Sequence, residues 1–321
     1  MRTSKLLTGI SILHLICIQF VTAQQNNFSE NYTAYLPELR KLNYQLVRNP
    51  PPMPDSNART FIKPVTKNIE GPNGLISLRI FKPKLIRAAV LDIHGGGWSD
   101  GIAAFDDKFN DELASRCKVA VVSVDYRLAP ANPFPAGLDD CKAAIRWLLN
   151  NSDKDFNTKN VFISGWSSGS HLAALTTLYV RDSLHAIERV KGVNLQYGLY
   201  DLGGTPSFRQ ATDSTPFMNR QVLDYVINLV FNGWTMAQKQ DPRFSPLYAD
   251  LHNLPPAIFT VGTADPVVDD SFFMEACWRL AGNKTYLAVY PEAPHAFNGF
   301  PLKIAKLANE KIFQWINKLC Q

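Results

Sequence analysis

The stretch Asn160–Leu175, "NVFISGWSSGSHLAAL", decides the fold, because an apolar run typical of a buried strand is followed at once by a helical pattern. A serine held on such a strand-to-helix turn needs residues without bulk two places before it and two places after it. Ser167 meets this G-x-S-x-G rule, since Gly165 and Gly169 flank it. The stretch therefore predicts a nucleophilic serine at the end of a strand.

The other three serines of the stretch fail the same test. Ser164, Ser168 and Ser170 each have a phenylalanine, tryptophan or leucine at one or both flanking positions. Glycine and serine are common in loops, so a plain turn is the alternative interpretation of this pattern taken alone. A serine hydroxyl also needs a base to accept its proton and donors to stabilise an oxyanion, and the rest of the chain must supply them.

The base and the acid are expected after the serine, in the order serine, acid, histidine. Of the six histidines, only His295 lies beyond the last plausible acid loop, just after the strand-like run "TYLAVY". A solvent-exposed loop histidine is the alternative. Asp265 follows the run "AIFTVG" and is the predicted acid, with the task of fixing the imidazole tautomer. Asp269 and Asp270 are the fallback choices for the acid. They are less favoured, because both fit the first turn of the next helix.

The oxyanion donors are predicted in the segment "LDIHGGGWSDG". Its consecutive glycines follow an apolar run and let the backbone pass close to a substrate with its N–H groups directed inward. The predicted donors are the backbone N–H groups of Gly96, Gly97 and Ser168. A flexible turn or a phosphate cradle is the alternative, but neither a G-x-x-x-x-G-K nor a G-x-G-x-x-G continuation is present.

Short apolar runs alternate with helical segments over most of the chain, namely "AAVLDI", "VAVVSV", "NVFIS", "VKGVNLQYG", "AIFTVG" and "YLAVY". This alternation predicts an α/β fold with a mostly parallel sheet covered on both faces. An antiparallel hairpin is predicted before these runs, on either side of "EGPNG". Helices are predicted near Tyr35–Val47, at "RQVLDYVINLVF" within residues 201–241, and over residues 302–319. We expect the segment 201–241 to lie over the strand ends, where such sheets bind ligands.

The N-terminus has the features of a signal peptide. Two basic residues precede an apolar stretch, and small residues stand where a peptidase would cut, before Gln24. Residues 1–23 are therefore predicted to be removed and the protein to be secreted. A retained membrane anchor is the alternative, although the stretch is shorter than the roughly 20 apolar residues of a spanning helix.

The charge, the cysteines and the sequons say less about the function than the motifs do. The formal charge is +5 without a basic run, so nucleic acid is not expected as a partner. Four cysteines remain after signal removal: Cys117, Cys141, Cys277 and Cys320. Four cysteines allow three pairings, and the sequence does not choose among them. It also leaves open whether they form disulfides or stay free thiols. Four N-x-[ST] sequons make a glycoprotein possible: Asn27, Asn31, Asn150 and Asn283.

The chain resembles the hormone-sensitive-lipase-like esterases of the α/β-hydrolase fold from about Ala88 to its end. The resemblance rests on "HGGGW", "DYRLAPANPFPAGLDD", "GWSSG", "LPPAIFTVGTADPVVDD" and "HAF" in this order. It implies a carboxylic-ester hydrolase with a Ser167–Asp265–His295 triad and no cofactor. No metal is expected either, because no cysteine stands in a C-x-x-C pair. The resemblance also implies a helical cap built from N-terminal and inserted segments. The corresponding division is residues 24–60 as an N-terminal arm or cap segment and 61–321 as the hydrolase domain, with a cap insertion at about 202–240.

One departure from the family pattern stands beside the nucleophile. The family usually has G-D-S-A-G-G, whereas this chain has G-W-S-S-G-S, so Trp166 replaces an aspartate that is not part of the triad. The resemblance assigns His94 and Arg127 to bracing the loops. The sequence thus predicts a secreted serine carboxylesterase for small or medium acyl esters. An amidase or deacetylase with the same machinery, or a non-catalytic receptor, are the alternatives, because function depends on the site and not on the fold.

Overall fold

The structure is a computed structural model that describes residues 32–48 and 60–321. The predicted signal peptide and the sequons at Asn27 and Asn31 lie outside these residues. Within the described ranges, no helix is both long and apolar enough to cross a membrane. Cys117, Cys141, Cys277 and Cys320 are all free thiols.

The strands form one eight-stranded sheet in the order β1-β2-β4-β3-β5-β6-β7-β8. The first two pairings, β1 with β2 and β2 with β4, are antiparallel, and the other five are parallel. The predicted mostly parallel sheet and the N-terminal hairpin are therefore confirmed. The strands are β1 Val65–Gly71, β2 Gly74–Phe81, β3 Ala88–Ile93, β4 Val119–Asp125, β5 Val161–Trp166, β6 Val190–Gln196, β7 Ala257–Gly262 and β8 Thr285–Tyr290.

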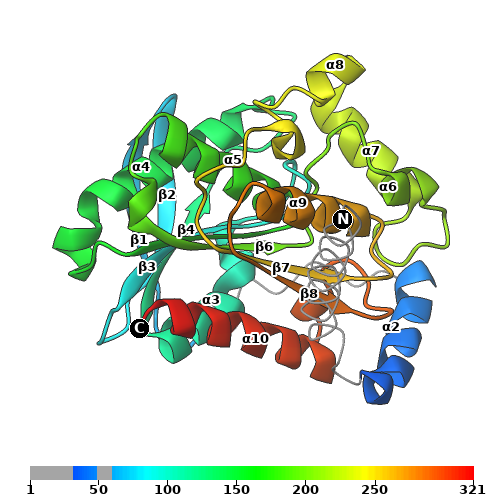
Figure 1. Cartoon of the computed structure of the whole chain (residues 1–321), viewed down its shortest axis with the longest axis horizontal. Helices are drawn as coiled ribbons and strands as arrows, with labels where there is room; N and C mark the ends of the chain where they lie inside the picture. The colour runs from blue at the N-terminus through cyan, green and yellow to red at the C-terminus, as the bar shows by residue number, and fades with distance from the viewer. Residues whose placement is uncertain (1–31, 49–59) are drawn as a thin grey trace, which may run out of the picture.

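Helices cover both faces of this sheet (Figure 1). α4, α5 and α9 pack on one face, while α3 and α10 pack on the other. The central strands are buried on both sides, which is why β3 has only buried residues and no polar alternation. The α-helices are α2 Leu36–Arg48, α3 Asp107–Cys117, α4 Ala136–Phe156, α5 Ser168–Asp182, α6 Pro206–Gln210, α7 Arg220–Phe231, α8 Met236–Lys239, α9 Val268–Leu280 and α10 Lys303–Leu319.

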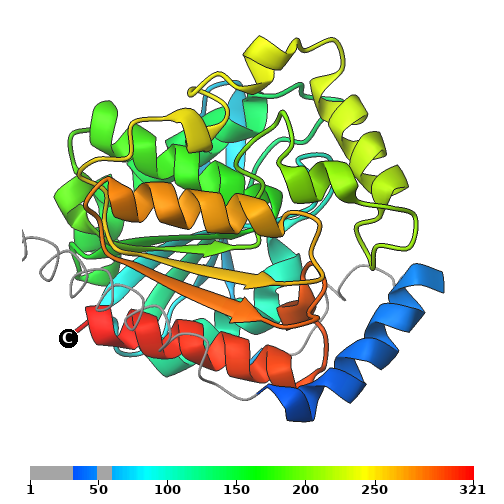
Figure 2. The same cartoon turned by 45° about the vertical axis from the view of Figure 1, so that its right-hand side comes forward.

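Short 3-10 helices complete the described segments: η1 Thr33–Tyr35, η2 Ala103–Asp106, η3 Ile187–Arg189, η4 Pro246–Tyr248 and η5 Phe297–Gly299. The helices α2, α6 and α7 lie on the side toward which the arrowheads of β7 and β8 point (Figure 2). The carboxyl ends of the parallel strands therefore face the N-terminal helix and the inserted helices. The division of the chain into arm, cap and hydrolase domain stays a prediction.

The N-terminal helix α2 contacts the segment that follows β8. The Arg40 guanidinium makes two hydrogen bonds to the Glu292 carboxylate, and the side chain of Asn43 donates to the Glu292 carbonyl oxygen at 2.9 Å. Leu39, on the inner face of α2, is fully buried. This packing fixes the N-terminal segment beside the loop that carries His295.

Candidate active site

Ser167 lies on the sharp turn between β5 and α5. Its backbone has φ 54° and ψ −125°, an unusual conformation for a residue with a side chain. A β-carbon added to Gly165 would lie 2.3 Å from the Gly169 carbonyl oxygen, and one added to Gly169 would lie 2.0 Å from that of Ile93. The turn thus has no room for side chains at its flanks, which explains the glycine spacing in physical terms.

The structure brings three of the predicted residues into one hydrogen-bonded row. The Ser167 hydroxyl is 2.8 Å from His295 Nε2, and His295 Nδ1 is 2.8 Å from Asp265 Oδ2. Each residue follows a different parallel strand, namely β5, β7 and β8, so the common edge of the sheet assembles them. His295 and Asp265 are each 2 % exposed, so the histidine and the carboxylate meet away from solvent. This arrangement can move a proton from a serine to a base that an acid orients.

The other two acids near this loop have different partners. Asp269 and Asp270 lie in the first turn of α9, as the sequence indicates. The buried Asp270 carboxylate accepts hydrogen bonds from the backbone N–H groups of Tyr200 and Asp201, and burial raises its pKa to about 7. Asp270 therefore fixes the chain after β6, and Asp265 is the acid that contacts the histidine.

The glycine loop after β3 passes next to the serine turn. Gly96 has φ +119° and Gly97 has φ +61°, and neither N–H donates to a protein acceptor in the described part of the chain. Ser168 is the first residue of α5, where a backbone N–H has no partner within the helix. These are the three predicted donors, and none of their N–H groups has a hydrogen-bond acceptor among the described residues. Their role at an oxyanion stays a prediction.

Two braces hold the loops that flank the site. The buried His94 ring stacks on Tyr126 with centroids 4.2 Å apart, its Nδ1 lies 2.7 Å from the Gly95 carbonyl oxygen, and burial lowers its pKa. Arg127 binds the Asp140 carboxylate through two N–H groups at 2.8 Å each. These contacts support the glycine loop and the turn after β4, as the resemblance implies for both residues.

The surroundings of His295 include two aromatic rings that no sequence motif indicated. The Tyr197 ring meets the imidazole edge to face at 5.0 Å, and the Phe217 ring stacks on it at 6.5 Å with an angle of 19°. Tyr197 comes directly after β6, and Phe217 lies between α6 and α7. No local pattern marks either residue, because the contacts join segments about 80 to 100 residues apart.

A family model of the alpha/beta hydrolase fold matches residues 90–299, which is more than half of the chain. The chain belongs to this family. The resemblance inferred from the sequence motifs is thereby confirmed. Within the family match lie the glycine loop, Ser167, Asp265 and His295.

Several characterised proteins are similar to this alpha/beta hydrolase. Carboxylesterase NlhH of Mycobacterium tuberculosis is 32 % identical over 248 residues, which cover 73 % of this chain and 74 % of that protein. An arylesterase of Saccharolobus solfataricus is 34 % identical over 203 residues, or 60 % of this chain and 63 % of that protein. A solved structure of a hyperthermophilic esterase from Pyrobaculum calidifontis superimposes with a TM-score of 0.76 at 27 % identity, covering 93 % of this chain and 96 % of that one.

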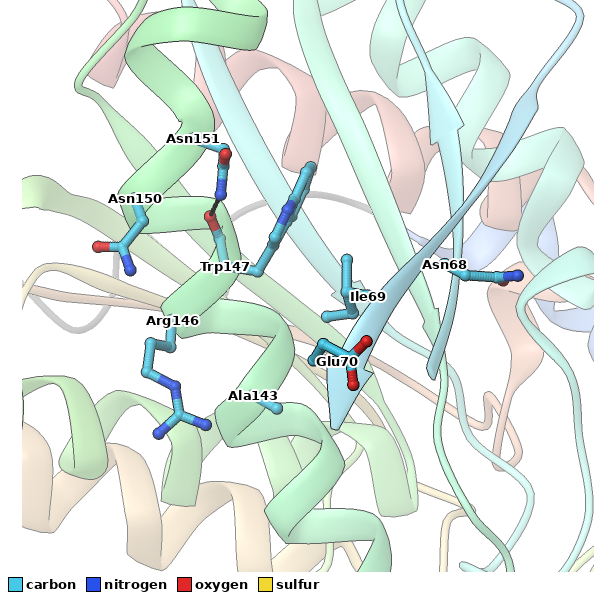
Figure 3. A pocket seen from close by; sticks show the side chains of 8 residues that line it. All are labelled: Asn68, Ile69, Glu70, Ala143, Arg146, Trp147, Asn150 and Asn151. Carbon is cyan, nitrogen blue, oxygen red and sulfur yellow. Dashed lines mark hydrogen bonds between the residues drawn. The ribbon is translucent and has the colours of Figure 1, made fainter. Parts of the chain in front are cut away.

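A hollow of about 370 Å³ lies away from this site, between β1 and α4 (Figure 3). Its lining contains no serine, cysteine or histidine: Asn68, Ile69, Glu70, Ala143, Arg146, Trp147, Asn150 and Asn151. It therefore has no nucleophile and base of the kind found at Ser167. Among the described residues, no group of three or more histidine, cysteine or acidic side chains is placed to hold a metal ion.

Proposed function

We propose that this alpha/beta hydrolase is a secreted serine carboxylesterase that acts on small or medium acyl esters. The observation that carries the proposal is the row of hydrogen bonds from Ser167 through His295 to Asp265 beside three free backbone donors. The similarity to a carboxylesterase and an arylesterase supports an ester as the substrate.

In the proposed mechanism the tautomer of His295 decides the direction of proton transfer. With its Nδ1–H donating to Asp265, the Nε2 atom has a lone pair that accepts the Ser167 proton as Oγ attacks the ester carbonyl carbon. The carbonyl oxygen becomes an oxyanion, which the N–H groups of Gly96, Gly97 and Ser168 stabilise. The alcohol then leaves with the proton from His295, and a serine-bound acyl group stays behind.

Water completes the proposed cycle. His295 accepts a proton from water, the hydroxide attacks the acyl carbon, and the carboxylic acid leaves as Ser167 regains its proton. The walls of the site support the proposed preference for small or medium acyl groups. A β-carbon at Gly97 would lie 2.8 Å from Val226 of α7, so this helix lies close above the proposed oxyanion donors. Phe217 covers the imidazole on another side.

A panel of p-nitrophenyl esters with acetyl, butyryl and longer chains tests the proposal. Ser167→Ala should lower kcat by about 10⁴-fold or more, because the nucleophile is lost. Ser170→Ala is the matched control, since its hydroxyl bonds to Tyr200 and lies outside the proposed machinery. Full activity of Ser167→Ala would rule out the assignment, and faster turnover of matched amides than of esters would favour an amidase or deacetylase. A serine-directed phosphonate that failed to label the protein would favour a non-catalytic receptor.

Secretion is proposed on the N-terminal sequence alone. The basic start, the apolar stretch and the small residues before Gln24 support it. N-terminal sequencing of protein recovered from culture medium should begin at Gln24. Recovery of the intact N-terminus in the membrane fraction would instead indicate a retained anchor.

A further inference from the structure

Trp166 stands directly before the nucleophile, and its indole is held by a buried acid. Nε1 donates to both carboxylate oxygens of Asp106, each at 2.8 Å. Asp106 ends η2 and occupies the N-cap position of α3, where an aspartate usually accepts from the helix backbone, yet it makes no such bond. Its carboxylate is directed to the indole instead. The Trp166 side chain, which could adopt several rotamers, is thereby fixed in one orientation.

The fixed indole supports the glycine loop. A β-carbon added to Gly95 would lie 2.4 Å from Cε3 and 2.5 Å from Cζ3 of Trp166. The six-membered part of the indole therefore occupies the space beside the Gly95 backbone. Gly95 immediately precedes Gly96 and Gly97, so a shift of the ring would move the two proposed oxyanion donors.

The same indole also contacts the aromatic neighbour of the proposed base. It meets the Tyr197 ring at 6.5 Å and 63°, and Tyr197 in turn meets the His295 imidazole at 5.0 Å. The Tyr197 hydroxyl donates to Asn298 at 2.6 Å, which fixes the tyrosine from its far end. Trp166 is thus packed between the glycine loop and the aromatic neighbour of the histidine.

A second buried acid lies behind Asp106. Asp92 of β3 accepts from Asn110 of α3 and from Ser123 of β4, each at 2.8 Å. Burial raises the pKa of Asp92 to about 6, and burial followed by the charge of Asp92 raises the pKa of Asp106 well above its usual range. Two neighbouring buried carboxyl groups are more stable when they share one proton than when both are ionised. Asp106 can therefore donate that proton toward Asp92 while it accepts from the indole.

We propose that Trp166 is a positioning residue for ester hydrolysis, and that its bond to Asp106 holds the Gly95 backbone so that Gly96 and Gly97 present their N–H groups to the oxyanion. This inference rests on the function proposed above. An oxyanion exists only after attack on the carbonyl, so misplaced donors cost turnover and leave ground-state binding almost unchanged. The competing role is ordinary core packing. In that case, substitution of Trp166 would change the stability of the protein and leave kcat unchanged.

Four single variants test the proposal by steady-state kinetics on p-nitrophenyl acetate and by thermal denaturation. Trp166→Phe removes the N–H and shortens the ring, and Asp106→Ala removes the acceptor. Asp106→Asn is the conservative variant, because its amide oxygen can accept from the indole while its NH₂ group donates to Asp92. Trp278→Phe is the matched control, since the buried Trp278 indole of α9 also donates a hydrogen bond, to the Pro255 carbonyl at 2.9 Å.

We expect kcat to fall about tenfold in Trp166→Phe and in Asp106→Ala, less than the 10²- to 10³-fold loss of an oxyanion donor itself. KM should stay within about twofold, and Asp106→Asn should keep kcat within about threefold of the parent enzyme. Trp278→Phe should lower Tm with kcat unchanged. The double variant Trp166→Phe/Asp106→Ala should be no slower than the slower single variant, because both changes remove one shared bond.

A parent-like kcat in folded Trp166→Phe, a loss expressed in KM, or additive losses in the double variant would each overturn the proposal. If Trp166→Phe does not fold, the contrast between Asp106→Ala and Asp106→Asn decides by the same criterion. Ser167→Ala separates this inference from the function on which it rests. An inactive Ser167→Ala beside a fully active Trp166→Phe contradicts the positioning role alone, whereas an active Ser167→Ala contradicts the proposed function.

Discussion

Two buried histidines belong to the segments around the serine turn, and they differ in their hydrogen-bond partners. His295, after β8, lies between the Asp265 carboxylate and the Ser167 hydroxyl. His171, in the first turns of α5, accepts from the Trp98 indole N–H at 3.1 Å and lies 2.6 Å from the Phe244 carbonyl through Nε2. Both rings have a hydrogen bond at each nitrogen, and both are almost fully buried.

The partners determine what each ring can do. An indole N–H can only donate, so Nδ1 of His171 is the acceptor and Nε2 carries the proton that the carbonyl accepts. Among the described residues no carboxylate forms a hydrogen bond or ion pair with this ring, and burial lowers the pKa of His171 to about 4. His171 is therefore a neutral structural group among aromatic side chains, whereas His295 has an acid behind it and a proton donor in front. Burial alone does not identify a catalytic histidine.

The largest effect that would test this comparison is expected at His295. Replacement by glutamine removes the base, so kcat for p-nitrophenyl acetate should fall about 10⁴-fold, while Tm should change by a few degrees at most. His171→Gln, the matched change at the second buried histidine, should keep kcat within a few fold. The comparison would be wrong if the two variants lost activity equally.

A medium effect is expected in the free energy of unfolding of the protein as the pH falls and His171 becomes protonated. The folded pKa of His171 is about 4, below the value of about 6.5 for an unfolded chain. Between these two values the unfolded state binds more protons, so the stability contributed by the neutral ring is complete above pH 6.5 and is lost as the pH falls toward 4. A shift of this size corresponds to about 3 kcal/mol.

The measurement is the difference in free energy of unfolding between the parent protein and His171→Gln, from urea denaturation at pH 7, 5.5 and 4. Glutamine does not titrate, so the other ionisable groups cancel in the difference. The advantage of the parent should shrink by about 3 kcal/mol from pH 7 to pH 4. A difference that stayed constant over this range would show that His171 is not held neutral in the folded state.

Much of the fold and the residues of the candidate site could be predicted from the sequence. The strand bounds follow from continuous apolar runs, and α7 spans Arg220–Phe231 as its helical periodicity predicts, with Asn219 accepting from the Val222 N–H at its start. The predicted site residues come from the order of motifs along the chain. Their catalytic roles stay predictions until the variants are measured.

The features that the sequence did not indicate are contacts between distant segments. Asp106 precedes Trp166 by 60 residues, and no local pattern joins an aspartate at a helix start to an indole at the end of a strand. The short helices α6 and α8 have four or five residues each, too few for a periodic signal. The tautomer and orientation of the His171 ring likewise depend on Trp98 and Phe244, which lie 73 residues before and after it.

The smallest effect is expected at Phe217, whose ring stacks on His295 and meets Phe300 at 5.8 Å. Phe217 has φ +63°, so the chain adopts a backbone conformation that costs a side-chain-bearing residue about 1–2 kcal/mol. Because a substrate alcohol or acyl group beside His295 would contact this ring, Phe217→Ala should raise KM for p-nitrophenyl butyrate about fivefold with little change in kcat. Tyr225→Ala is the control, since Tyr225 is 66 % exposed on α7 and should leave both constants unchanged. A lower kcat at constant KM would instead mean that Phe217 orients the imidazole, and the ring would then belong to the positioning of His295 and not to the binding of substrate.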